Sequence, residues 1–140
     1  MTLRTLLTSG AQKLGIMLSD QQADAFMVYL VELEKWNRKI NLTAIRNDQD
    51  IVIKHFLDSL SYLKGFVPAP ALRLVDMGAG AGFPAVPIKI AHPEIGVTMV
   101  DFKQMVYVQE KAQYYPANEL PEGGTVLDIS GTELRRRLRE

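Results

Sequence analysis

The sequence predicts an α/β protein in which an N-terminal helical region, residues 1–66, precedes a partial doubly wound sheet. Apolar residues recur at helical spacing through the first region. Two later apolar runs, "LRLVDMG" and "GVTMVD", each end in an acid and have the pattern of buried parallel strands. The segment "FPAVPIKIAHP" between them has the length of a short helix. Strand, helix and strand in this order predict a right-handed βαβ unit over residues 71–102.

Two helices of the first region can be placed in some detail. The segment "LSDQQADAFMVYLVELEKWNRKI" has Ser19 or Asp20 as its expected N-cap. We expect its core face to contain Phe26, Leu30, Leu33 and Ile40, with Tyr29 and Trp36 beside them. Asp48 is the expected cap of a further helix, whose buried face would hold Val52, Phe56, Leu60 and Leu63. "VPAPA" then predicts a linker, because proline cannot continue a helix.

The βαβ unit and the remainder follow. Pro84 and Pro87 are compatible with a helix only near its first turn. Residues 103–140 predict a strand at 105–108, a turn at "PEGG", a strand at "TVLDI" and an arginine-rich helix. The helix that usually follows the second strand of a doubly wound sheet is hard to place. "QEKAQYYP" is short and is stopped by Pro116.

The composition excludes several classes of protein. Lys plus Arg and Asp plus Glu number 16 each, so net charge indicates no polyanionic partner. The absence of cysteine excludes disulfides, thiolate metal sites and cysteine nucleophiles, and is compatible with a reducing compartment. Apolar runs are far shorter than the roughly 20 residues of a membrane span. We expect a soluble, cytoplasmic protein, and the sequence indicates no oligomeric state.

The stretch "VDMGAGAGFPAVP" contains the candidate site. Gly78, Gly80 and Gly82 lie where a strand turns into a helix, where glycine permits positive φ and a close approach of ligand to backbone. Asp101 ends the next strand, the position from which a doubly wound fold binds ribose hydroxyls. The loop is therefore a candidate for holding the nucleoside end of a cofactor. The alternative is a glycine-rich turn that only packs a helix against a strand.

The spacing of the glycines favours one cofactor. The dinucleotide fingerprint G-x-G-x-x-G would place its third glycine where this chain has Phe83. The spacing here, G-x-G-x-G, is commoner in proteins that bind S-adenosylmethionine, which lacks a pyrophosphate. Asp76, just before the loop, suits an amine-bearing ligand better than a phosphate.

Over about residues 1–102, and most closely over 28–101, the chain resembles the glucose-inhibited division protein B (RsmG) family. The pieces that carry the resemblance are "LEKWNRKINLTAIRN", "IVIKHFLDSL", "LVDMGAGAGFPAVPIKIAHPE" and "VTMVD". The resemblance implies S-adenosylmethionine-dependent methylation of N7 of a guanosine in small-subunit ribosomal RNA. It also implies that Gly78 and Phe83 contact the cofactor, that Gly80 and Gly82 shape the loop, and that Asp101 lies near the ribose. We expect no catalytic acid or base, because the N7 lone pair attacks the sulfonium methyl directly.

The sequence departs from this family in two places. Ala85 follows Pro84 where the family usually has glycine, and its methyl group could crowd the helix start. After residue 102 the family pattern is not recognisable, and residues 104–140 resemble the C-terminal part of an ATP sulfurylase instead. In "ISGTELRRRL", Ser130, Thr132 and Arg135 could bind a phosphate, although the sulfurylase H-x-x-H element is absent.

The chain therefore resembles a chimera joined near residue 102, whether a natural fusion, a rearranged gene or an assembly artefact. We expect methyl transfer to be impaired, because later strands of the sheet would be missing. Two alternatives are a nucleotidyltransferase or sulfurylase-like fragment and a non-catalytic fragment that is stable only with a partner.

Other polar residues have structural and functional interpretations. His55, Asp58 and Ser59 share one helical face, which favours a hydrogen-bonded cluster over a catalytic triad or a metal site. Asn41 and Thr43 could form a cap and turn or, with His55 and Asp58, a polar lip over the site. No metal site is predicted. The C-terminal arginines are read as a solvated helix face, with RNA binding as the weaker alternative.

Overall fold

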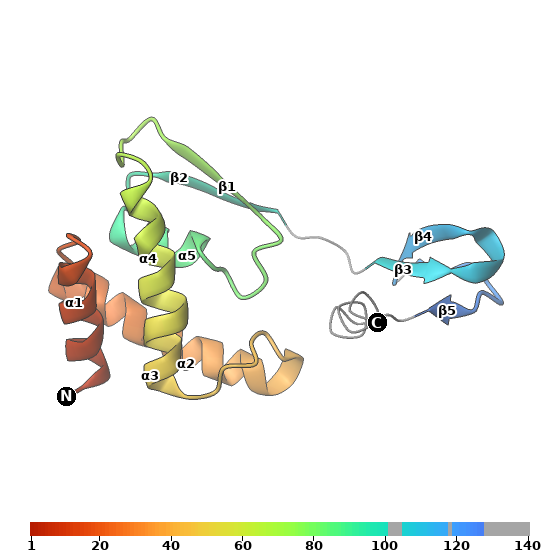
Figure 1. The fold of residues 1–140 in the computed structure, drawn as a ribbon, viewed down its shortest axis with the longest axis horizontal. Helices are drawn as coiled ribbons and strands as arrows, with labels where there is room; N and C mark the ends of the chain where they lie inside the picture. Colours follow the sequence, from red (N-terminus) through yellow and green to blue (C-terminus); the bar gives the residue numbers. More distant parts are fainter. Residues whose placement is uncertain (101–104, 118, 128–140) are drawn as a thin grey trace, which may run out of the picture. The chain divides into compact units, whose positions relative to one another are not determined.

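The structure is a computed structural model that describes residues 1–100, 105–117 and 119–127. The chain divides into two compact units, Met1–Asp101 and Phe102–Glu140 (Figure 1). The described residues of each unit form a sheet of their own, with two strands in the first and three in the second. Within the described residues, no helix is both long enough and apolar enough to cross a membrane.

The first unit begins with two helices, α1 (Leu3–Lys13) and α2 (Asp20–Ile40). Ser19 caps α2: its side chain accepts from the Gln22 amide, and the Gln22 side chain accepts from the Ser19 amide. This reciprocal capping box satisfies two amides that the helix leaves unpaired, and it confirms the predicted start of the helix. Asn41 ends α2 with a left-handed backbone, φ 49°.

The next helical segment consists of several short stretches that follow one another without a break. They are α3 (Asp48–Ile51), a π-helical turn (Val52–Leu57), α4 (Asp58–Ser61) and a 3-10 turn (Tyr62–Lys64). The predicted cap at Asp48 is wrong by one position. Asn47 has the extended backbone of a cap and accepts a 3.1 Å hydrogen bond from the Asp50 amide, while Asp48 is already helical.

The core of the first unit lies where these helices meet the helix α5 (Ala85–Ala91) and the sheet. Its buried members are Leu7, Ala11, Phe26, Leu30, Leu33, Ile51, Val52, Phe56, Leu60, Leu63, Ile88, Ala91 and Ile95. The predicted faces are confirmed except at the C-terminal end of α2. Trp36 and Ile40 are 45% and 60% exposed, and the ring of Trp36 lies under the Lys39 ammonium at 4.9 Å. Helical spacing identifies which face of a helix is apolar. It does not show how far along the helix the neighbouring elements cover that face.

The βαβ unit is confirmed as β1 (Arg73–Met77), α5 (Ala85–Ala91) and β2 (Gly96–Val100). The strands pair in parallel, with Arg73 opposite Gly96 and Met77 opposite Val100. Pro84 immediately precedes α5 and Pro87 lies in its first turn, as the sequence predicts. The side-chain amide of Gln22 on α2 donates to the carbonyls of Ile90 and Ala91. These bonds provide partners for two carbonyls at the C-terminal end of α5, where a helix leaves its last carbonyls unpaired.

The sheet of the first unit is covered on one face. Alternate residues of β1 and their partners on β2 form the open face: Arg73, Val75, Met77, Thr98 and Val100. Val75 and Met77 are 57% and 66% exposed. The apolar pattern of these strands indicated burial, but among the described residues of the first unit this face of the sheet stays exposed, and α5 packs on the other face.

The second unit is an antiparallel sheet of β3 (Met105–Val108), β4 (Gln113–Pro116) and β5 (Val126–Leu127), in the order β4-β3-β5. The predicted strand at 105–108 is confirmed. So is the turn at "PEGG", where the Gly124 amide donates to the Pro121 carbonyl. The strand β4 was not expected. A 3-10 turn (Gln109–Lys111) and Ala112, at φ 49°, reverse the chain into it.

Candidate functional site

The glycine loop, residues 78–83, connects β1 to α5. Gly78, Gly80 and Gly82 have φ values of 75°, 53° and 99°, which L side chains rarely adopt. At Gly82 space is limiting as well, because an added Cβ would lie 2.7 Å from Val86 Cγ2 and 3.0 Å from the Tyr29 hydroxyl. At Gly80 an added Cβ would meet only the Gly78 carbonyl, at 4.0 Å. The loop therefore needs glycine for its conformation and leaves the backbone at Gly80 open to a ligand.

Asp76 holds the two ends of this loop together. Its side chain is buried, 9% exposed, and Oδ2 accepts a 3.2 Å hydrogen bond from the Ala85 amide at the start of α5. The Gly78 amide in turn donates to the Val100 carbonyl of β2, at 2.8 Å. Ala85 is fully buried, so its methyl group is accommodated at the helix start. A contact between Asp76 and a cofactor stays a prediction.

Tyr29 anchors the loop to α2, a role for which the sequence contains no signal. Its hydroxyl donates a 2.6 Å hydrogen bond to the Ala81 carbonyl. Burial raises the pKa of Tyr29, and the negative charge of Asp76 raises it further. The phenol therefore stays protonated and remains a donor.

Phe83 ends the loop within an aromatic cluster. Its ring stacks on the imidazole of His55, with centroids 4.4 Å apart and planes 10° from parallel. Tyr29 and Phe56 complete the cluster at 5.6 and 6.1 Å from Phe83. The loop is thus held between α2 and the π-helical turn that contains His55, and π-turns are frequent at functional sites.

A polar chain runs from His55 back to α2. His55 Nε2 lies 2.8 Å from the Thr43 hydroxyl, and the Thr43 amide donates to Asn37 Oδ1 at 2.9 Å. Burial lowers the pKa of His55, and the charge of Asp58 opposes this. The structure thus brings Thr43 and His55, two residues of the predicted polar lip, together beside the glycine loop, and their contact with a substrate stays a prediction.

Other predicted site residues lie apart from this arrangement. Asn41 Oδ1 accepts from Arg46, and Asp58 is exposed. His55 contacts Thr43 and no catalytic triad forms among the side chains that the structure describes. In the same part of the chain, no cluster of three or more His, Asp or Glu side chains could hold a metal ion. Asp101, Ser130, Thr132 and Arg135 lie outside the described residues.

Comparison with known proteins places this arrangement in a family. The model of the GidB family, "rRNA small subunit methyltransferase G", matches residues 22–113, well over half of the 140-residue chain. The chain belongs to the rRNA small subunit methyltransferase G family. The match contains α2 from Gln22 onwards, the His55 turn and the whole glycine loop, so every described residue of the candidate site lies within it.

Curated relatives carry the same name. A "Ribosomal RNA small subunit methyltransferase G" of Acetivibrio thermocellus is 46% identical over 133 residues, 95% of this chain and 52% of the relative. Those of Geobacter sp. (strain M21) and Streptococcus pneumoniae serotype 19F (strain G54) are 48% and 45% identical over 98 and 107 residues. These two alignments cover 70% and 74% of this chain, and 44% and 45% of the relatives.

The chain spans about half the length of the curated relatives that it matches. The alignment with the Acetivibrio relative covers 95% of this chain and so extends well into residues 104–140. This extent gives no support to a sulfurylase origin for that segment. The chimera near residue 102 stays a prediction.

Proposed function

We propose that this chain carries the cofactor-binding part of an S-adenosylmethionine-dependent methyltransferase that acts on N7 of a guanosine in small-subunit ribosomal RNA. The observation that carries the proposal is the glycine loop, with three positive-φ glycines between a parallel strand and the helix that follows it. The names of the curated relatives support the substrate class.

The residues present fit the proposed cofactor. Gly78 and Gly80 are exposed and present bare backbone, while Phe83 is half-buried and held flat against His55. Bound S-adenosylmethionine would supply an electrophilic methyl group, and Gly78, Gly80 and Phe83 are the described residues that we propose to hold it. Asp76 would act through the loop, since its carboxylate positions the start of α5. Contact of Asp101 with the ribose is part of the same proposal.

The reaction needs no general base in this proposal. The guanine N7 lone pair is available at neutral pH, so the protein has to align two reactants and exclude water. The Tyr29 hydrogen bond and the Phe83–His55 stack make the loop rigid, which favours such alignment. We further propose that this chain turns over more slowly than full-length relatives, because Val75 and Met77 leave one face of the sheet uncovered.

Calorimetric titration with S-adenosylmethionine, with ATP as the comparison ligand, tests the proposal. We expect a Kd on the order of micromolar for the methyl donor alone. Gly80→Ala should weaken binding, and Gly15→Ala is its matched control. Both glycines have positive φ and open space around the missing Cβ, so both substitutions cost about 1–2 kcal/mol in backbone conformation.

Only Gly80 lies in the loop, so equal affinities of the two variants would refute the site. A turnover assay on undermethylated small subunits tests the expected impairment, and a rate equal to that of a full-length relative would contradict it.

A further inference from the structure

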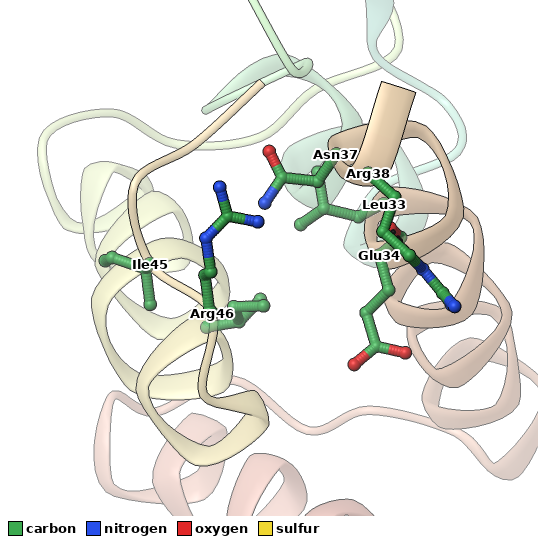
Figure 2. Close-up of a pocket in the computed structure, with 7 residues that line it drawn as sticks. Leu33, Glu34, Asn37, Arg38, Ile45 and Arg46 are labelled. Atoms are coloured by element: carbon green, nitrogen blue, oxygen red, sulfur yellow. Dashed lines mark hydrogen bonds between the residues drawn. The ribbon is translucent and has the colours of Figure 1, made fainter. Parts of the chain in front are cut away.

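A pocket of the first unit lies between α2, the segment 41–47 and α3, and the glycine loop does not line it. Its volume is about 350 Å³, within the range of small-molecule sites. The lining residues are Leu33, Glu34, Asn37, Arg38, Ile45, Arg46 and Ile51 (Figure 2). Three of them are aliphatic and four are polar, so the pocket combines apolar walls with directional groups.

The amide of Asn37 has a fixed orientation in this pocket. Asn37 is only 5% exposed, and its Oδ1 accepts from the Thr43 amide at 2.9 Å. Its NH₂ group must therefore point the other way. Figure 2 shows that group directed into the pocket, towards the guanidinium of Arg46 on the opposite wall. Two groups that can only donate hydrogen bonds thus face a common space, which an acceptor would fill.

Arg46 has capacity left for such an acceptor. Its Nη2 donates to Asn41 Oδ1 at 3.2 Å, and no carboxylate forms an ion pair with it among the described residues. The guanidinium has five N–H donors in a planar fork, so one such bond leaves a donor edge for a ligand. Figure 2 shows Arg38 directed away from this space.

Glu34 supplies acceptors on a different side of the same pocket. Figure 2 shows its carboxylate projecting below the gap between Asn37 and Arg46. Hydrogen bonding to the neighbouring carboxyl of Asp48 raises the pKa of Glu34, with burial as a further cause. Two adjacent carboxyl groups favour a ligand that brings N–H donors and disfavour a phosphate, which they would repel.

We propose that this pocket binds a guanine base of single-stranded RNA. Guanine has acceptors at O6 and N7 for the Arg46 fork and the Asn37 amide, and donors at N1 and N2 for the Glu34 carboxylate. Leu33, Ile45 and Ile51 provide apolar contact for the ring. Adenine and cytosine each offer only one amino donor and match the arrangement less well.

The base in this pocket is a neighbour of the methylated guanosine and not the methylated base itself. An arginine that donates to N7 occupies the lone pair that methyl transfer requires. The pocket is linked to the cofactor loop through Asn37, Thr43 and His55, so it can position the RNA beside that loop. This inference rests on the proposed function, because it takes RNA as the substrate.

The test is titration of the ¹⁵N-labelled chain with guanosine 5′-monophosphate, followed by amide chemical shifts. Adenosine and cytidine monophosphates and inorganic phosphate are the comparisons. We expect guanosine monophosphate to shift the amides of segment 41–47 and to bind about ten-fold or more tightly than the other probes. Equal binding of all nucleotides, or equal binding of inorganic phosphate, would overturn the proposal.

Matched variants identify the groups that bind the base. Glu34→Gln keeps the size of the side chain and removes the carboxylate, while Glu32→Gln makes the same change at a site paired with Lys35. Arg46→Lys keeps the charge and removes the fork, and Arg73→Lys on the open sheet face is its control. We expect at least about ten-fold weaker guanine binding for Glu34→Gln and Arg46→Lys only. Unchanged affinity of both would overturn the assignment.

The outcome is independent of the cofactor titration. S-adenosylmethionine binding without guanine binding would refute the assignment of this pocket as a guanine site and would not affect the proposed function. Guanine binding without S-adenosylmethionine binding would refute the proposed cofactor site and would still support this pocket as a nucleotide site.

Discussion

Replacing Tyr29 by phenylalanine removes a single oxygen from the anchor between α2 and the glycine loop. The ring contacts with Phe56, at 5.3 Å, and Phe83, at 5.6 Å, are kept. The hydroxyl's 2.6 Å hydrogen bond to the Ala81 carbonyl is lost, and that carbonyl is left without this partner. Deleting one partner of a part-buried hydrogen bond costs about 1–2 kcal/mol. We therefore expect the free energy of unfolding of the first unit to fall by that amount.

The assay is urea unfolding followed by tryptophan fluorescence. Trp36 is the single tryptophan of the chain and lies in α2, so its emission reports the first unit. Amide hydrogen exchange at Gly82 and Phe83 should also accelerate, because the loop opens locally more often. The control is Tyr62→Phe, since Tyr62 is 58% exposed and should change stability by less than about 0.5 kcal/mol. Equal stability and exchange in the two variants would refute the anchoring role.

Three further predictions concern the same unit. Asp76→Ala should destabilise it by about 1–3 kcal/mol, because the buried Ala85 amide loses its acceptor. Unfolding free energy should fall as the pH drops below about 6.5, because burial lowers the pKa of His55 in the folded state and the unfolded chain then binds the proton more tightly. Met77→Lys should reduce binding of a hydrophobic fluorescent dye and leave stability within about 0.5 kcal/mol, since Met77 is exposed on the open face.

Each of these predictions has an outcome that contradicts it. Asp76→Asn retains an oxygen acceptor and should cost less than Asp76→Ala, so the reverse order would argue against capping of α5. His55→Asn should flatten the pH dependence between the two pKa values, and an unchanged slope would assign it to another group. Dye binding that Met77→Lys leaves unchanged would mean that the dye binds elsewhere than the open face.

Local sequence patterns predicted the elements that depend on neighbouring residues. The N-cap at Ser19, the buried face from Val52 to Leu63 and the strand–loop–helix–strand unit are all confirmed. The glycine spacing placed the loop because positive φ is a local property that glycine tolerates. The predicted helix cap was wrong by one position because Asn47 and Asp48 are both good N-cap residues. The predicted burial was wrong for Trp36 and for one face of β1 because no described element packs against them.

The sequence by itself determined the order of elements in the first unit, the glycine loop and, through its motifs, the resemblance to a family that the comparisons confirm. Only the tertiary structure decided which side chains reach that loop. Tyr29 donates to a carbonyl 52 positions away, and Asn37 turns its amide into a pocket that also contains Arg46. Such contacts depend on how α2 packs against α5 and the π-helical turn. No periodicity encodes them, because periodicity specifies which face of an element is buried but not which residue it meets.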